Sequence, residues 1–258
     1  HIFVVTTVCN MSCIYCQANN GVECSHLIMN KEMAEKAVDI ALQSPEQSLC
    51  FEFQGGEPLV NFEIIKHIVQ YAEIHKENHE IAYTVVTNLT LLNEEMLDFF
   101  VQYSFGISTS VDGSELVHNN NRPYADGTGT FKKVINSVER VRKAGLQVGA
   151  IETTTRFSLD FPKEIVHTYV DMGFESIFIR PLTPLGKAAK SWEKIGYTSE
   201  EFIIFYQQAL DELIEINKAG RFIKEDHASI LLRRIRGDLW RRCWAVGVLC
   251  GWQYFYMR

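Results

Sequence analysis

Six strand-like stretches alternate with six helix-like stretches along the chain, and this alternation limits the possible folds more than any other feature. The strand-like stretches are short β-branched or aromatic runs, at residues 2–7, 49–54, 82–87, 105–111, 147–154 and 176–181. Segments with helical periodicity follow them, at residues 30–42, 61–75, 93–101, 130–144, 162–172 and 199–218. Repeated strand–helix units predict parallel strands with right-handed crossovers, as a barrel or an open sheet. Eight units would need more chain than is present, so we predict an α/β fold with a partial (β/α)6, TIM-like barrel.

The composition indicates one large hydrophobic core, and the negative net charge argues against negatively charged partners. The 258 residues are 47% hydrophobic, and the net charge of −7 argues against nucleic acid or an anionic membrane as a partner. No apolar run approaches the roughly 20 residues that span a bilayer, and no signal-peptide pattern opens the chain. We therefore expect a cytoplasmic protein. The first residues are already strand-like, so we also expect the chain to come from a longer protein.

Three of the seven cysteines lie within eight positions, in "VCNMSCIYCQ". An odd number of cysteines in a chain of this size makes a disulfide framework improbable and favours a metal or catalytic use. Cys9, Cys13 and Cys16 directly follow the first predicted strand. In parallel α/β barrels, functional residues gather in the loops after the strands, so this loop is the first candidate for a site.

The three thiols suit an iron–sulfur cluster better than a structural zinc ion. Zinc usually takes four ligands, and neither a fourth cysteine nor the nearest histidine, His26, stands at a zinc-like spacing. In a four-iron cluster, three thiolates hold one iron each, and the fourth iron stays open to a substrate or cofactor.

The Cx3Cx2C spacing, with Tyr15 before the last cysteine, resembles the radical S-adenosylmethionine enzymes. The resemblance implies a [4Fe–4S] cluster on Cys9, Cys13 and Cys16 whose open iron binds S-adenosylmethionine. It also implies the chemistry: an electron from the cluster cleaves the sulfonium, and the resulting 5′-deoxyadenosyl radical removes a hydrogen atom from a substrate. By the same resemblance, Tyr15 belongs to the cofactor site.

"FQGGEP" ends the second predicted strand and contains a second candidate element. Two glycines let backbone approach a ligand closely, and a glutamate can accept from an ammonium group. In the radical S-adenosylmethionine enzymes, which this chain resembles, the corresponding segment is the GGE motif that binds the methionyl amine. The resemblance implies that role for Gly55, Gly56 and Glu57. "VVTNLT" then matches a TNG-like segment at Asn88, with Leu89 where glycine is commoner.

The remaining candidates follow the fourth and sixth predicted strands. "STSVDG" and "NNNRP" resemble the segment in which a serine and an arginine contact the ribose and carboxylate of the cofactor, which implies these roles for Ser110 and Arg122. An arginine fork also suits a carboxylate chemically. We interpret Asp112 as a turn residue before glycine. In "FIRPL", the resemblance places Ile179 near adenine.

Nearly the whole chain resembles the peptide-modifying maturase branch, most of all the His-Xaa-Ser system maturases; anaerobic sulfatase maturases share the FQGGEP segment. This implies a peptide or protein substrate and a reductant such as flavodoxin or ferredoxin. We expect a core barrel at residues 1–220 and, at 221–258, the start of a C-terminal extension of the SPASM or twitch type. Cys243 and Cys250 resemble the opening of such an extension, with an auxiliary cluster, or belong to a buried apolar tail.

Three functions remain open at this point. The leading one is a radical S-adenosylmethionine oxidoreductase that modifies a ribosomally made peptide. A second is a sulfatase-type maturase that oxidises a cysteine or serine. The third is an iron–sulfur or zinc protein without enzymatic activity, which metal analysis and the visible spectrum would distinguish.

Overall fold

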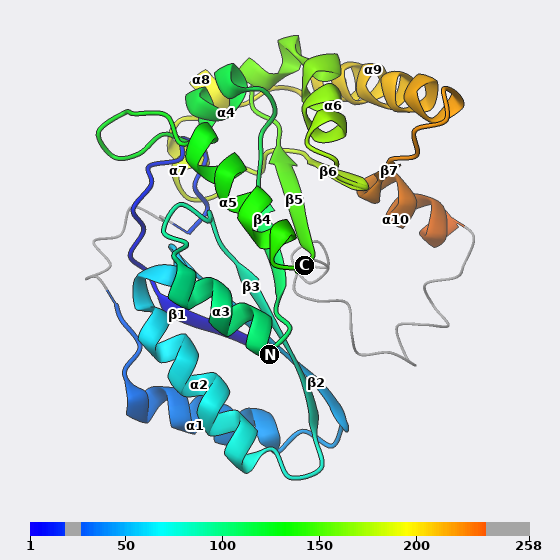
Figure 1. Ribbon diagram of the computed structural model, residues 1–258. Helices are drawn as coiled ribbons and strands as arrows, with labels where there is room; N and C mark the ends of the chain where they lie inside the picture. The colour runs from blue at the N-terminus through cyan, green and yellow to red at the C-terminus, as the bar shows by residue number, and fades with distance from the viewer. Residues whose placement is uncertain (19–26, 236–258) are drawn as a thin grey trace.

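Seven parallel strands, in chain order, form a single sheet that curves into an open barrel (Figure 1). The computed structural model describes residues 1–18 and 27–235. Within these residues, β2 is the only strand that pairs with β1, whose end also forms an isolated antiparallel bridge between Thr6 and Ile28, and β7 pairs only with β6. The strands are β1 (Ile2–Thr6), β2 (Ser48–Gly55), β3 (Glu80–Val86), β4 (Gly106–Ser110), β5 (Val148–Thr153), β6 (Ser176–Arg180) and β7 (Lys224–Glu225).

Helices connect successive strands and pack on the outside of the sheet, with α1 against α2 and α6 against α9. The α-helices are α1 (Lys31–Leu42), α2 (Phe62–His75), α3 (Glu94–Gln102), α4 (Glu115–Asn121), α5 (Phe131–Lys143), α6 (Pro162–Asp171), α7 (Lys187–Lys190), α8 (Trp192–Ile195), α9 (Ser199–Lys218) and α10 (Asp226–Ile235). Two 3-10 turns, η1 (Pro58–Asn61) and η2 (Phe157–Asp160), precede α2 and α6.

The predicted fold class is confirmed, and the six predicted strands and six predicted helices are all present. The predicted helix starts are accurate because the capping side chains act as expected. Asn30 and Asn93 accept from the backbone N–H of Met33 and Met96, and Thr198 forms a capping box with Glu201. The prediction omitted β7 and the helices α4, α7, α8 and α10, most of which are too short to show a periodicity.

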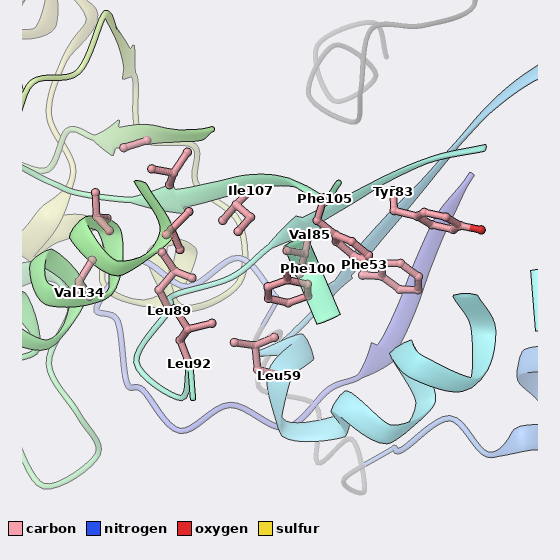
Figure 2. Packing of buried hydrophobic residues seen from close by; sticks show 14 of the residues in the cluster. Phe53, Leu59, Tyr83, Val85, Leu89, Leu92, Phe100, Phe105, Ile107 and Val134 are labelled. Carbon is pink, nitrogen blue, oxygen red and sulfur yellow. The ribbon is translucent and has the colours of Figure 1, made fainter. Parts of the chain in front are cut away.

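The main core lies between the sheet and the helix layer, and aromatic rings fill its centre (Figure 2). Phe53 and Tyr83 lie on β2 and β3, Phe105 directly precedes β4, and all three are buried. The Phe105 ring stacks on Phe53 and Tyr83, with centroids 5.9 and 5.6 Å apart. Alternate strand residues face this core, so the residues between them face the concave side of the barrel.

Residues beyond 220 continue the sheet where the structure describes them. Strand β7 pairs with β6, and α10 packs against β6. The boundary between a core domain and an extension at residue 220 stays a prediction, and Cys243 and Cys250 lie outside the described residues. In the described part of the chain, no helix is both long and apolar enough to cross a membrane.

Glu152, on β5, has a fully buried carboxylate, and few hydrogen bonds offset the cost of its burial. Its Oε2 atom accepts a hydrogen bond from the Thr154 hydroxyl at 2.8 Å, whereas Oε1 is buried with no partner among the described residues. Burial raises the pKa of Glu152 well above its ordinary value, and the charge of Asp112 raises this pKa further. Between the pKa of Glu152 in the unfolded chain and its pKa in the folded protein, the folded protein keeps a proton that the unfolded chain releases. The stability that this group contributes is therefore lost as the pH rises through the folded pKa.

We expect Glu152→Gln to increase the free energy of unfolding above about pH 5, by up to about 1.4 kcal/mol for each further pH unit, because glutamine stays neutral. Urea unfolding of the reconstituted protein between about pH 5 and pH 8 measures the difference. Glu80→Gln, at an exposed position of β3, is the control and should show no such trend. Parallel pH curves for Glu152→Gln and wild type would contradict the prediction.

Candidate functional site

The loop with the three cysteines leaves the carboxyl end of β1 and is held from one side by the chain after β4. The backbone N–H of Ser12 donates to the Pro123 carbonyl at 2.9 Å, and the N–H of Ile14 donates to the Asn121 carbonyl at 3.0 Å. These hydrogen bonds fix the loop across the open end of the barrel.

The segment after β6 holds the same loop from the other side. The N–H of Lys187 donates to the Cys16 carbonyl at 2.9 Å, and its ammonium group donates to the Ser12 hydroxyl at 3.0 Å. The ring of Tyr15 is buried in a small cluster with Leu182, Ala188 and Tyr197. The cysteine loop is therefore enclosed between two segments that are distant in the sequence.

A cavity of about 200 Å³ lies beside this loop, at the carboxyl ends of the strands. The cavity contains all three cysteines of the motif and every predicted cofactor-binding residue except Ile179. The lining residues that the sequence predicted are Cys9, Cys13, Tyr15, Cys16, Gly55, Gly56, Glu57, Asn88, Ser110 and Arg122. The structure thus brings residues from four strand ends to one place.

Ile179 is placed differently from the other predicted residues. Its side chain is fully buried in the main core, and its backbone N–H donates to the Glu225 carboxylate at 3.1 Å. Because successive strand residues face opposite sides, Arg180 lines the cavity instead. An adenine contact from Ile179 stays a prediction, and its side chain is not among those that line this cavity.

The two glycines after β2 permit a close approach of β1 and the cysteine loop. A Cβ atom on Gly55 would lie 2.4 Å from the Thr6 carbonyl oxygen, and one on Gly56 would lie 2.4 Å from the Val8 carbonyl oxygen. The N–H of Glu57 then donates to the same Val8 carbonyl at 2.8 Å. No larger residue fits at either position without moving the strand that leads to Cys9.

Glu57 is buried at the base of the cavity and organises the surrounding loops. Its Oε1 atom accepts from the Leu59 N–H at 3.0 Å and the Thr87 hydroxyl at 2.6 Å, and its Oε2 atom accepts from the Asn88 N–H at 2.7 Å. Burial raises the pKa of Glu57, whereas these hydrogen bonds lower it. Oε2 accepts one hydrogen bond, so a lone pair remains for a ligand ammonium group.

Leu89 adopts the backbone conformation that glycine would favour at this position. Its φ is 59°, in the left-handed region, and its side chain is fully buried. The strain costs roughly 1–2 kcal/mol, and burying a leucine side chain contributes about 1.5–3 kcal/mol. Burial therefore offsets the strain, and the turn after Asn88 keeps its shape without a glycine.

Arg122 follows α4 and reaches the cavity from beneath the cysteine loop. Its side chain is buried, and Nη1 donates to the Tyr15 hydroxyl at 2.6 Å. Its Nε atom is buried with no hydrogen-bond partner among the described residues. A buried N–H without an acceptor is costly, so this edge of the guanidinium suits an anionic ligand.

Asp112 does more than the turn role that the sequence indicated. Gly113 does take a positive φ of 120°, as a turn requires, but the Asp112 side chain is fully buried. Its two oxygens accept from the Tyr15 hydroxyl at 3.0 and 2.8 Å. The turn is present as predicted, and the contact with Tyr15 is an addition that the Asp-Gly pattern could not reveal, because that pattern gives no information on the tertiary partner of the carboxylate.

The three cysteine thiols line one cavity, and thiolates are the usual ligands of iron–sulfur clusters, so these side chains fit such a cluster. Desolvation raises the pKa of Cys9 to about 11 and also raises that of Cys13, so both thiols would release protons on binding iron at neutral pH. His26 lies outside the described residues.

The sequence analysis singled out neither Gln54 nor Gly186. Gln54 and Arg180 line the cavity from the concave side of β2 and β6. Gly186, with φ 57° and ψ −127°, lies where a Cβ atom would be 2.4 Å from the Cys16 carbonyl oxygen. A glycine before the short helical run "KAAK" was a visible signal, but its contact with the cysteine loop exists only in the folded chain.

The sequence model of the Radical SAM superfamily matches residues 3–178. Because this is more than half of the chain, the protein belongs to the Radical SAM superfamily. An uncharacterized protein of Methanocaldococcus jannaschii is 31% identical over 186 residues, which cover 72% of this chain and 63% of that protein. A cysteine-type anaerobic sulfatase-maturating enzyme of Clostridium novyi is 24% identical and covers 91% of this chain.

Solved structures show the same fold. The structure described as native anSMEcpe with bound AdoMet has a TM-score of 0.79 at 24% identity, covering 91% of this chain and 65% of that chain. Streptococcus suis SuiB bound to its precursor peptide SuiA has a TM-score of 0.63 at 14% identity, covering 86% of this chain and 47% of that chain. The chain spans less than two thirds of these proteins and 64% of the clostridial enzyme.

We expect Gly186→Ala to remove most of the iron that the reconstituted protein holds and to destabilise it by about 2 kcal/mol or more, because strain and a backbone clash act together. Iron analysis and thermal unfolding measure both effects. Gly220→Ala is a matched control, since Gly220 also has a positive φ, of 92°, but has open space around its Cβ position. Gly220→Ala should retain the iron, and full iron content in Gly186→Ala would contradict the prediction.

Proposed function

We propose that this chain is the cluster- and S-adenosylmethionine-binding part of a radical S-adenosylmethionine enzyme that modifies a ribosomally made peptide. The observation that carries the proposal is the convergence of three thiols, a glycine–glycine–glutamate turn and a buried arginine on one cavity. None of these elements is conclusive alone, although the cysteine motif is a strong signal. Together they supply donors for iron, for an ammonium group and for a carboxylate.

Different residues of the cavity would bind the cluster and the different groups of S-adenosylmethionine. Cys9, Cys13 and Cys16 would hold three irons of a [4Fe–4S] cluster, and the chemistry it supplies with S-adenosylmethionine is hydrogen-atom abstraction by a 5′-deoxyadenosyl radical. Glu57 would accept from the ligand ammonium group, and Arg122 would bind the ligand carboxylate. Asn88 and Ser110 line the same cavity and offer hydrogen bonds to the ribose and its surroundings. The chain thereby orients the ligand and limits access of water.

The concave side of the barrel supports a peptide as substrate. Gln54 and Arg180 line the cavity from β2 and β6. Gln54 donates to the Glu52 carboxylate and Arg180 to the Thr153 hydroxyl at 3.0 Å, and each side chain carries more than one N–H group, so we propose that they also contact the peptide. Structures similar to this one were solved with bound peptides, namely anSMEcpe with the Kp18Cys peptide and SuiB with SuiA. A reductant such as flavodoxin or ferredoxin would supply the electron.

A second candidate is a sulfatase-type maturase, favoured by the similarity to sulfatase-maturating enzymes of Clostridium novyi and Clostridium perfringens. The two candidates differ in substrate. Reconstituted full-length protein is incubated anaerobically with reductant, S-adenosylmethionine and either a His-Xaa-Ser precursor peptide or a cysteine-containing sulfatase peptide. The mass change of each peptide and the 5′-deoxyadenosine formed identify the substrate. If neither product forms with either peptide, the peptide maturase proposal fails.

We expect Cys9→Ala, Cys13→Ala and Cys16→Ala each to abolish the cluster absorbance and the formation of 5′-deoxyadenosine, because each thiolate would hold an iron that no other side chain can take over. Iron analysis and anaerobic absorption spectra measure the outcome. Cys50→Ala is the control, since Cys50 lies on β2 outside the cavity lining, and it should keep the iron. Cofactor cleavage by any of the three variants would refute the cluster assignment.

We expect Arg122→Lys to retain the cluster but to bind S-adenosylmethionine about 10- to 100-fold more weakly, because lysine keeps the charge and loses the planar fork. Anaerobic calorimetry gives the affinity. Arg156→Lys, at a half-exposed arginine on the surface, is the control and should bind as wild type does. An unchanged affinity in Arg122→Lys would show that this arginine does not bind the ligand carboxylate.

A further inference from the structure

The Tyr15 hydroxyl lies between the two buried charged groups beneath the cysteine loop. It accepts a hydrogen bond from Nη1 of Arg122 at 2.6 Å and donates toward the Asp112 carboxylate, 2.8 Å from Oδ2. All three side chains are buried: Tyr15 is 4% exposed, Arg122 8% and Asp112 0%. One hydroxyl thus connects the cysteine loop to the end of β4 and to the chain after α4.

Asp112 and Arg122 attract each other, yet in the described part of the chain they are linked through the Tyr15 hydroxyl and not by a direct ion pair. A buried carboxylate and a buried guanidinium normally pair in a bidentate fork when nothing separates them. Here the hydroxyl occupies the position between them. The guanidinium is consequently held near its counter-charge while its Nε remains without a partner among the described residues.

The surroundings fix each end of this arrangement independently. The Asp112 carboxylate accepts from the Thr153 N–H at 3.4 Å, and the Asp112 N–H donates to Nδ1 of the buried His118 at 3.3 Å. The Tyr15 ring is packed in the cluster that also contains Leu182, with the Arg122 guanidinium 5.9 Å from the ring centroid. Neither the aspartate nor the tyrosine can move far, so the arginine is the one member whose position the hydroxyl decides.

We infer that Tyr15 is a positioning residue: its hydroxyl keeps Arg122 from collapsing onto Asp112 and so holds the guanidinium ready for the carboxylate of the bound ligand. The inference rests on the proposed function, because it assumes that the ligand is S-adenosylmethionine. Without the hydroxyl, Asp112 and Arg122 can pair directly. A ligand carboxylate must then compete with a buried internal carboxylate for the same guanidinium.

The test measures discrimination between S-adenosylmethionine and its decarboxylated analogue, which has the same sulfonium and adenosine but no carboxylate. Both affinities are measured by anaerobic calorimetry on the reconstituted protein, wild type and Tyr15→Phe. Wild type should prefer S-adenosylmethionine by about 10- to 100-fold, the worth of a charge-assisted contact, and Tyr15→Phe should lose most of that preference. Affinity for the analogue should change by no more than about twofold.

Two controls separate positioning from general damage to the site. Iron content and the cluster spectrum show whether Tyr15→Phe still assembles the cluster. Tyr83→Phe is the matched variant, because the buried Tyr83 hydroxyl also donates to a carboxylate, that of Glu73 at 2.8 Å, but Tyr83 lies outside the cavity lining. Tyr83→Phe should keep the wild-type preference between the two ligands.

The double variant Tyr15→Phe with Asp112→Asn provides a rescue. Removing the charge of Asp112 removes the competitor for Arg122, so the double variant should bind S-adenosylmethionine more tightly than Tyr15→Phe alone. Asp112→Asn by itself leaves the hydroxyl in place with an acceptor, and its affinity should equal or exceed that of wild type. If Tyr15→Phe loses its cluster, Asp112→Asn tests the inference instead. A tenfold weaker affinity of Asp112→Asn for S-adenosylmethionine overturns the inference.

The remaining outcomes also have definite meanings. Tyr15 has a structural role if Tyr15→Phe loses affinity for both ligands by the same factor, or if the double variant binds S-adenosylmethionine more weakly than Tyr15→Phe does. Either result overturns the inference and leaves the proposed function intact. Wild-type protein that holds its cluster but binds neither ligand overturns the proposed function, and the inference with it.

Discussion

The parallel pairing of successive strands is the constraint on which the rest of the molecule depends. Hydrogen bonds between parallel neighbours place the carboxyl ends of β1 to β6 at one edge, so the loops that follow them meet there whatever their sequences. The cysteine loop, the glycine–glycine–glutamate turn and the arginine after α4 come from different strand units. Their convergence follows from the sheet, and their chemistry follows from the loops.

Buried polar groups, more than apolar contacts, give the site its shape. Glu57 connects the ends of β2 and β3 through two hydrogen bonds, from Thr87 and Asn88, and Asp112 connects the end of β4 to the cysteine loop through Tyr15. Burying such carboxylates is unfavourable unless donors satisfy them, so each network fixes its loops in one arrangement. The protein thereby holds three thiols, a glutamate carboxylate and a guanidinium in fixed relation around one cavity.

Local signals explain why most of the fold was predictable. Each long strand carries β-branched or aromatic runs, and helix starts such as Asn30 and Thr198 are marked by side chains that cap through contacts a few residues away. Elements whose stability comes from tertiary contacts were missed. The two-residue strand β7 exists because Lys224 and Glu225 pair with β6, and no periodicity can be seen in two residues.

The sequence by itself determined the chemistry of the site: the spacing of Cys9, Cys13 and Cys16, the paired glycines and the arginine were visible as residue types at fixed intervals. Only the tertiary structure decided which groups face each other. It placed Arg180 rather than Ile179 at the cavity, and Gly186 against the Cys16 carbonyl. It also placed the Tyr15 hydroxyl between Asp112 and Arg122, at sequence separations of 97 and 107 residues. A sequence motif gives residue types and spacing within one segment of the chain. The contacts above form only when the sheet curves and brings distant loops together.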